Sequence, residues 1–127
     1  MGDRDAKNAL FDQFARVGKA LASGKRLEML DLLAQGERTV DALARASELG
    51  LSTASAHLQT LKAANLVATR REGTKVHYRL AGTDVAQLLA LNRAGASTRL
   101  PDVAAATSAY LGTQTDQGTR AELRQRV

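Results

Sequence analysis

The amino-acid sequence predicts a mostly α-helical protein with a small β-hairpin, and three observations support this fold class. Over most of the 127 residues, apolar side chains recur every three or four positions, which is the spacing of one helix face. Between residues 76 and 80 the period falls to two, as in a strand. The chain has two Phe, two Tyr and no Trp, so Leu, Val and Ala must form the core, as in closely packed helices.

The first predicted helix covers about residues 5–22 and is amphipathic. Apolar side chains at steps of four, three and four form a stripe along it, and a neighbouring aromatic residue widens the stripe. The residues concerned are Leu10, Phe14, Val17, Leu21 and Phe11. Ser23 then offers a hydroxyl as the N-cap of a second helix over about residues 25–34.

Two short helices joined by a tight turn come next. Thr39 is the predicted N-cap of the first, residues 40–46, and the second covers about residues 51–64. The predicted buried face of the second helix consists of Ala54, Leu58 and Leu61. Its outer face is mostly polar and consists of Ser52, Thr53, Ser55, Ala56, Gln59, Thr60 and Lys62. Two short helices arranged in this way are typical of a helix-turn-helix.

A β-hairpin is predicted directly after the second of these helices. Its strands cover residues 66–71 and 76–80, with Gly73 in the connection. In the second strand the side chains alternate, so that Val76, Tyr78 and Leu80 face the core while His77 and Arg79 face outward. A basic hairpin that follows a helix-turn-helix is the arrangement of a winged helix.

Beyond the hairpin, the sequence predicts further helices and a polar tail. One helix begins near Thr83, carries Val85, Leu88 and Leu89, and ends at about residue 94, where residues 95–98 interrupt it. Pro101 is predicted as the first residue of another helix that ends near residues 111–112. One long helix kinked at Pro101 is the alternative. Residues 113–127 are predicted to be a tail or linker with room for a short helix over 120–127.

The positive charge is concentrated in the predicted helix-turn-helix and hairpin. The formal net charge is +5, and the segment 52–79 holds five basic residues and one acid, which leaves 13 basic and 12 acidic residues elsewhere. A helix can offer hydroxyls and amides to base edges in the major groove, while Lys and Arg neutralise phosphates. Double-stranded DNA is therefore the predicted partner, with a solvated basic face as the alternative. The predicted contacts are Ser52, Thr53, Ser55, Ala56, His57, Gln59, Thr60, Lys62, Arg70, Arg71, Lys75, His77 and Arg79.

Segments 20–33, 55–67 and 70–80 resemble the ArsR/SmtB family of bacterial winged-helix repressors, and the resemblance covers about positions 10–95. It implies a homodimeric transcriptional repressor that binds a palindromic operator. In such proteins the first helix and the helices after the wing pair the subunits. This assigns residues 5–22 and 83–112 to dimerisation, 23–80 to DNA binding and 113–127 to a polar tail. The implied dimer contacts are Leu10, Phe11, Phe14, Val17, Leu21, Val85, Leu88 and Leu89.

The sequence departs from the family at its usual metal sites. The positions that match the cysteine pair of many members hold Thr39 and Asp41, and Ala86 stands two residues after Asp84 where others have the histidine of an Asp-x-His pair. We therefore expect neither a metal nor another cofactor. Phosphate-loop, dinucleotide-binding and zinc-protease motifs are missing from the sequence, so we do not expect an enzyme.

Several alternatives remain open at this stage. His57 suits a DNA contact and a structural hydrogen bond equally well, whereas His77 suits a solvated or phosphate-proximal position. The alternative function is a winged-helix module that docks on an acidic protein partner. The effector could be an apolar small molecule, a partner protein or none. With a polar start and no long apolar run, a cytoplasmic location is expected. Residues 120–127 also resemble the lead-in to the rhodanese domain of some family members.

Overall fold

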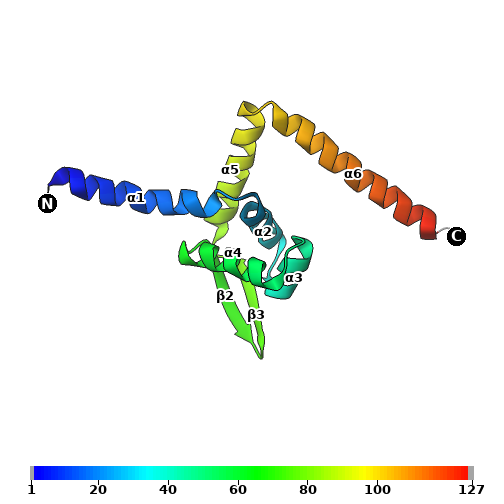
Figure 1. Ribbon diagram of the computed structural model, residues 1–127, viewed down its shortest axis with the longest axis horizontal. Helices are drawn as coiled ribbons and strands as arrows, with labels where there is room; N and C mark the ends of the chain where they lie inside the picture. Colours follow the sequence, from blue (N-terminus) through cyan, green and yellow to red (C-terminus); the bar gives the residue numbers. More distant parts are fainter. Residues whose placement is uncertain (1, 126–127) are drawn as a thin grey trace. The chain divides into compact units, whose positions relative to one another are not determined.

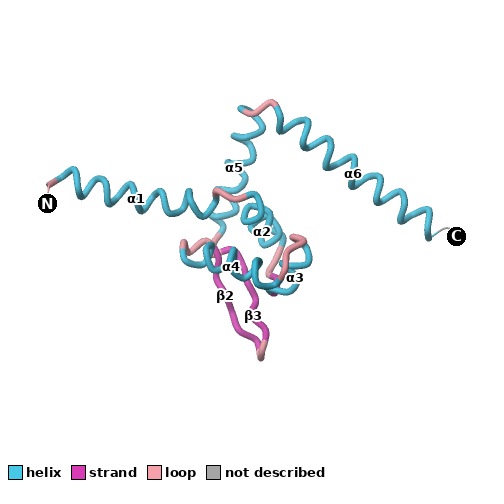
Figure 2. Tube along the Cα trace, viewed as in Figure 1, coloured by secondary structure: helices cyan, strands magenta, loops and turns pink. Residues whose placement is uncertain are grey.

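The computed structural model describes the backbone of residues 2–125 and the side chains of residues 2–113. It contains two compact units, Met1–Leu89 and Ala90–Val127. The elements, shown in Figures 1 and 2, are α1 (Asp3–Leu21), α2 (Gly24–Gln35), β1 (Arg38–Thr39), α3 (Val40–Ala46), α4 (Leu51–Ala63), β2 (Val67–Glu72), β3 (Lys75–Leu80), α5 (Thr83–Arg99) and α6 (Asp102–Gln125). The prediction of a mostly helical winged helix-turn-helix is confirmed.

Side chains cap two of the helices as the sequence predicts. Ser23 Oγ accepts a hydrogen bond from the backbone N–H of Arg26 (3.3 Å) at the start of α2. Thr39 Oγ1 accepts one from Ala42 N–H (3.2 Å) at the start of α3. Each contact satisfies an amide that the first helical turn leaves without a partner inside the helix. These caps fix where α2 and α3 begin.

The hairpin belongs to a three-stranded antiparallel sheet with the order β1-β3-β2. Gly73 makes the turn between β2 and β3 with φ 62°, a left-handed conformation that favours glycine. The strand β1 was not predicted, because two residues are too few to show a period of two. It pairs Arg38 with Tyr78 and Thr39 with His77. This third strand brings the loop before α3 against the outer edge of the hairpin.

The core lies in the unit that contains the helix-turn-helix. Ala54, Leu58 and Leu61 on α4 are all 0% exposed, which confirms the predicted buried face of that helix. Tyr78 on β3 is also buried, so the hairpin is packed onto the helices. The other buried apolar residues are Ala20, Met29, Leu30, Leu33, Leu43, Ala44, Leu66, Val67, Val85 and Leu89.

Val85 and Leu89 correct part of the predicted dimer interface. Both lie in the core of their own chain, with 4% and 8% of their surface exposed, and so they are not available to a partner. Leu88, at the edge of the same face of α5, is 37% exposed. The stripe on α1 divides in a similar way, because Val17 and Leu21 pack against the core. Leu10, Phe11 and Phe14 remain exposed.

The C-terminal helices are longer than predicted. The interruption expected at residues 95–98 is wrong, since α5 continues through them to Arg99, and Thr98 Oγ1 donates to Ala94 O (2.9 Å). Such a bond back to the preceding turn accommodates a hydroxyl within a helix. A break at Leu100 and Pro101 separates α5 from α6, so there are two helices rather than one kinked helix. The predicted tail is helical as far as Gln125, and residues 126–127 lie outside the described part. No helix among the described residues is both long and apolar enough to cross a membrane.

Candidate nucleic-acid interface

The helix α4 carries a polar outer face opposite its buried one. At 3.6 residues per turn, Ser52, Ala56, Gln59 and Ala63 fall on the line farthest from the core, and all four are exposed. Thr53, Thr60 and Lys62 are exposed beside this line, and Ser55 and His57 are half-buried. The side chains on this outer line are small or of moderate length, so the backbone of α4 can approach another surface closely.

One flank of α4 adjoins the hairpin. Gln59 Nε2 donates to the hydroxyl of Tyr78 (3.4 Å), and burial raises the pKa of that phenol, so it is neutral at physiological pH. Leu51 and Ser55 of α4 and Val76 of the hairpin line a groove of about 410 Å³ together with Thr39, Val40, Asp41, Thr74 and Lys75. Helix and hairpin thus form one continuous surface.

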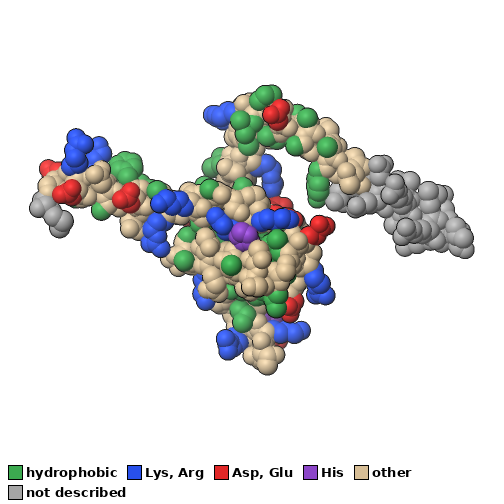
Figure 3. All heavy atoms as spheres, viewed as in Figure 1, with side chains coloured by type: hydrophobic (Ala, Val, Ile, Leu, Met, Phe, Trp, Pro, Cys, Tyr) green, Lys and Arg blue, Asp and Glu red, His purple; other side chains and the backbone are tan. Residues whose placement is uncertain are grey.

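The strand register divides the basic residues of the hairpin between its two faces. Arg71 lies opposite Val76, on the face that also carries Tyr78 and packs toward α4. Arg70 lies opposite His77, on the other face, which also carries Lys75 and Arg79. All four cationic side chains are exposed. Lys and Arg side chains accordingly project from more than one side of the hairpin (Figure 3).

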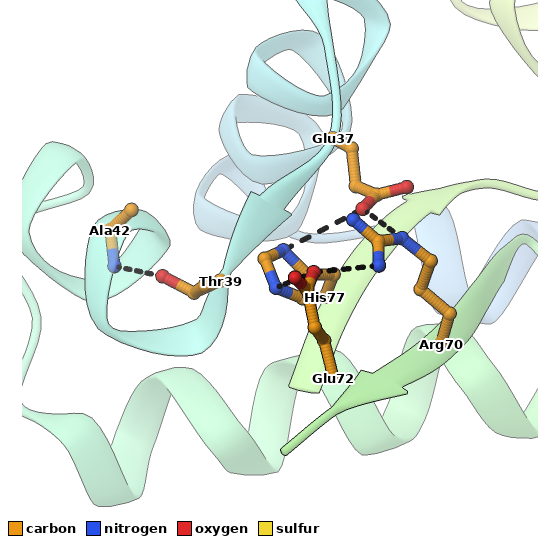
Figure 4. A network of polar contacts seen from close by, with 6 residues as sticks. All are labelled: Glu37, Thr39, Ala42, Arg70, Glu72 and His77. Atoms are coloured by element: carbon orange, nitrogen blue, oxygen red, sulfur yellow. Dashed lines mark hydrogen bonds and ion pairs between the residues drawn. The ribbon is translucent and has the colours of Figure 1, made fainter. Parts of the chain in front are cut away.

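Arg70 is held in an acidic cluster on the outer face (Figure 4). Its Nε donates to Glu37 Oε1 (2.5 Å) and its Nη1 to Glu72 Oε2 (2.9 Å). His77 bridges the same two carboxylates, with Nδ1–Oε1 and Nε2–Oε2 distances of 3.5 Å. The hydrogen bonds to Glu72 and then Glu37 raise the pKa of Arg70, and the bond from Arg70 lowers the pKa of Glu72.

The two carboxylates of this cluster weaken the attraction of Arg70 and His77 for a phosphate. The guanidinium of Arg70 and the carboxylates of Glu37 and Glu72 together carry a net charge of −1. Of the five basic residues in segment 52–79, Lys62, Arg71, Lys75 and Arg79 have no recorded ion pair in the described part of the chain. The sequence did not reveal the pairing, because Glu37 is 33 residues before Arg70 and reaches it only through β1.

His57 makes a structural hydrogen bond, which is one of the two roles that the sequence left open. Arg26 Nη1 donates to His57 Nδ1 (3.2 Å), since an arginine can only donate. Arg26 also donates from Nε to Ala20 O (2.7 Å) and from Nη2 to Lys19 O (3.1 Å). The half-buried imidazole therefore ties α4 to α2 and to the end of α1.

A second group of cations beside α4 was missed by the sequence reasoning. Arg16 and Lys19 lie on α1, outside the basic segment 52–79. Arg16 Nη2 donates to Ala63 O (3.1 Å) at the end of α4. Only the packing of α1 against α4 shows that these residues belong to the same surface. Among the described residues, no three His, Asp or Glu side chains are placed to hold a metal ion.

Comparison with known proteins agrees with this geometry. The family model described as "Bacterial regulatory protein, arsR family" matches residues 23–69. The HTH-type transcriptional regulator Rv0324 of Mycobacterium tuberculosis is 58% identical over 125 residues, which are 98% of this chain and 55% of that regulator. The chain thus spans about half the length of this relative. The uncharacterized HTH-type transcriptional regulator Rv0081 of the same species is 38% identical over 86 residues, which are 66% of this chain and 75% of that protein.

A solved structure shares both the fold and much of the sequence. It is the homodimeric winged helix-turn-helix DNA-binding domain (fragment 1-100) of Mb0332 from Mycobacterium bovis, described as a possible ArsR-family transcriptional regulator. The TM-score is 0.71 at 59% identity, over 79% of this chain and 91% of that one. The resemblance that the sequence motifs carry is therefore confirmed, and the chain belongs to the ArsR family of bacterial regulatory proteins.

Proposed function

We propose that this chain is a transcriptional regulator, acting as a repressor, that binds double-stranded DNA as a homodimer and reads a palindromic operator. The observation that carries the proposal is the exposed polar face of α4 beside a hairpin that bears Arg71, Lys75 and Arg79. In this arrangement α4 enters the major groove and the hairpin contacts the sugar-phosphate backbone. The role needs no catalysis, and it places the protein in the cytoplasm, where bacterial operators are found.

The chemistry of α4 determines how the operator is read. Ser52 and Gln59 offer a hydroxyl and an amide to base edges, and the methyl group of Ala56 fits beside a thymine methyl. A hydroxyl pairs with either a donor or an acceptor, so it discriminates less between bases than an arginine does. Part of the selectivity then comes from the sequence-dependent shape of the DNA.

Dimerisation is supported by the exposed part of α1. Leu10, Phe11 and Phe14 are 52%, 56% and 60% exposed, and the two rings meet edge to face with centroids 5.6 Å apart. Every residue from Gly2 to Arg16 is exposed, so within the described part of the unit Met1–Leu89 no other residues cover this stripe. A second copy would bury it, as the dimeric state of the Mb0332 domain suggests. Two-fold symmetry then places two α4 helices about 34 Å apart, or a multiple of that distance.

Selection of bound duplexes from a random pool, repeated with candidate inducers, tests this proposal. A palindromic consensus with half-sites one or more helical turns apart supports both DNA reading and dimerisation. Equal retention of all duplexes argues against sequence-specific reading. If the protein retains duplex DNA at low ionic strength no better than an uncharged control protein does, the proposed function is wrong.

A further inference from the structure

We propose that Arg16 and Lys19 of α1 form a second phosphate-binding site, which holds the DNA strand on the side of α4 opposite the hairpin. The inference rests on the proposed function and extends it to an element that the sequence assigns only to dimerisation. The site is a pocket of about 420 Å³ where α1, α2 and the C-terminal half of α4 meet. This α1–α4 pocket is lined by Arg16, Lys19, Ala20, Arg26, Thr60, Ala63 and Ala64.

The lining of the α1–α4 pocket is positively charged. It has three cations and no acid, and none of the three has a recorded ion pair within the described residues. The donors of Arg26 are directed to Ala20 O, Lys19 O and His57, so this residue holds the pocket in place while contributing its charge. An anion that enters the pocket is attracted by all three cations.

Arg16 and Lys19 are the residues available to that anion. Arg16 uses Nη2 for Ala63 O and Nη1 for Gln13 Oε1, both at 3.1 Å, out of five N–H groups. Lys19 is exposed, and its ammonium has no recorded partner in the part of the chain that the structure describes. A purely structural alternative is that Arg16 only caps the end of α4 through its bond to Ala63 O. This alternative explains Arg16 but leaves the ammonium of Lys19 without a role.

The position of the pocket identifies the anion as a backbone phosphate. The major groove is about 12 Å wide, so a helix inside it has one sugar-phosphate strand on each side. On α4, Ser55 and Gln59 turn toward the hairpin, whereas Thr60 turns toward the α1–α4 pocket. If the hairpin contacts the strand on one side, the pocket faces the strand on the other.

The test is the salt dependence of duplex affinity in Lys19→Ala, with Lys7→Ala as the matched control. Both lysines are exposed on α1, twelve residues apart, which is about 18 Å along the helix axis. The logarithm of the binding constant falls linearly as the logarithm of the salt concentration rises. Each lost phosphate contact makes the magnitude of this negative slope smaller by about 0.9, or by about 1.8 for a dimer with one contact per subunit. We expect this decrease for Lys19→Ala, a further decrease for Arg16→Ala/Lys19→Ala, and no change for Lys7→Ala.

Two other outcomes overturn different claims. If the unmodified protein does not bind duplex DNA, the proposed function fails. If it binds and Lys19→Ala has the same slope as Lys7→Ala, only the α1–α4 pocket is wrong. Thermal unfolding of each variant establishes that the fold is intact, and Lys19→Gln provides a second uncharged side chain. A duplex with neutral methylphosphonates placed one at a time should show a position where the substitution weakens binding by the unmodified protein but not by Arg16→Ala/Lys19→Ala.

Discussion

The two adjacent arginines of β2 should contribute very differently to DNA binding. Arg71 lies on the face of the hairpin that packs toward α4, whereas Arg70 on the opposite face is paired with Glu37 and Glu72. Replacing Arg71 by alanine should remove one phosphate contact per subunit. The magnitude of the slope of log binding constant against log salt should then decrease by about 1.8 for the dimer. Over a fourfold rise in salt, from about 50 to about 200 mM, the variant should lose roughly 12-fold less affinity than the unmodified protein.

The matched control replaces Arg70 together with one of the glutamates that pair with it, Glu72. In Arg70→Ala/Glu72→Gln one positive and one negative charge disappear, so the net charge of the protein stays at +5 and the cluster keeps its charge of −1. Titration of a labelled duplex at several salt concentrations should give this variant the slope of the unmodified protein. If its slope falls as far as that of Arg71→Ala, or if Arg71→Ala changes nothing, the assignment of the two hairpin faces is wrong.

Four further predictions concern the core, the dimer and the reading of bases. Leu58→Ala should lower the free energy of unfolding by about 2–5 kcal/mol in a denaturant titration, because Leu58 is 0% exposed. A decrease as small as that of an exposed leucine would contradict the burial of Leu58 in the core. Because the pKa of Tyr78 is raised on folding, stability should fall as pH rises above about 10, and Tyr78→Phe should remove that fall from an alkaline unfolding series. Phe14→Asp should yield monomers by sedimentation, and an unchanged profile would exclude the exposed α1 stripe from the interface. Ser52→Ala should change the preferred duplexes in a pool selection, whereas an unchanged consensus would remove Ser52 from base reading.

Local chemistry explains why much of the fold could be predicted from the sequence. Ser23 and Thr39 cap their helices through bonds to residues three positions later, and Gly73 makes its turn within four residues. The two faces of α4 follow from helical periodicity alone. Each of these features depends on residues that are neighbours in the chain, so a reading of the sequence is sufficient to find them.

The features that could not be predicted depend on contacts between distant residues. Periodicity shows that Val85 and Leu89 are apolar on one face, but not whether their own chain or a partner covers that face. The pairing of Arg70 with Glu37 needs β1, which is too short to recognise. The charge count over segment 52–79 therefore included a cation that is already paired. It also omitted Arg16 and Lys19, which reach the same surface from α1.

The helix α1 connects the two halves of the proposed function, because its opposite sides serve different partners. Phe14 lies on the side that continues toward Val17 and Leu21, whereas Lys19 lies in the lining of the α1–α4 pocket. Loss of the dimer uncouples two half-sites, so Phe14→Asp should weaken operator binding far more than binding to unrelated duplexes. Loss of a phosphate contact carries no sequence information, so Lys19→Ala should weaken both alike. If Phe14→Asp weakened binding to both kinds of duplex alike, or if Lys19→Ala weakened operator binding selectively, the two sides of α1 would not have separate roles.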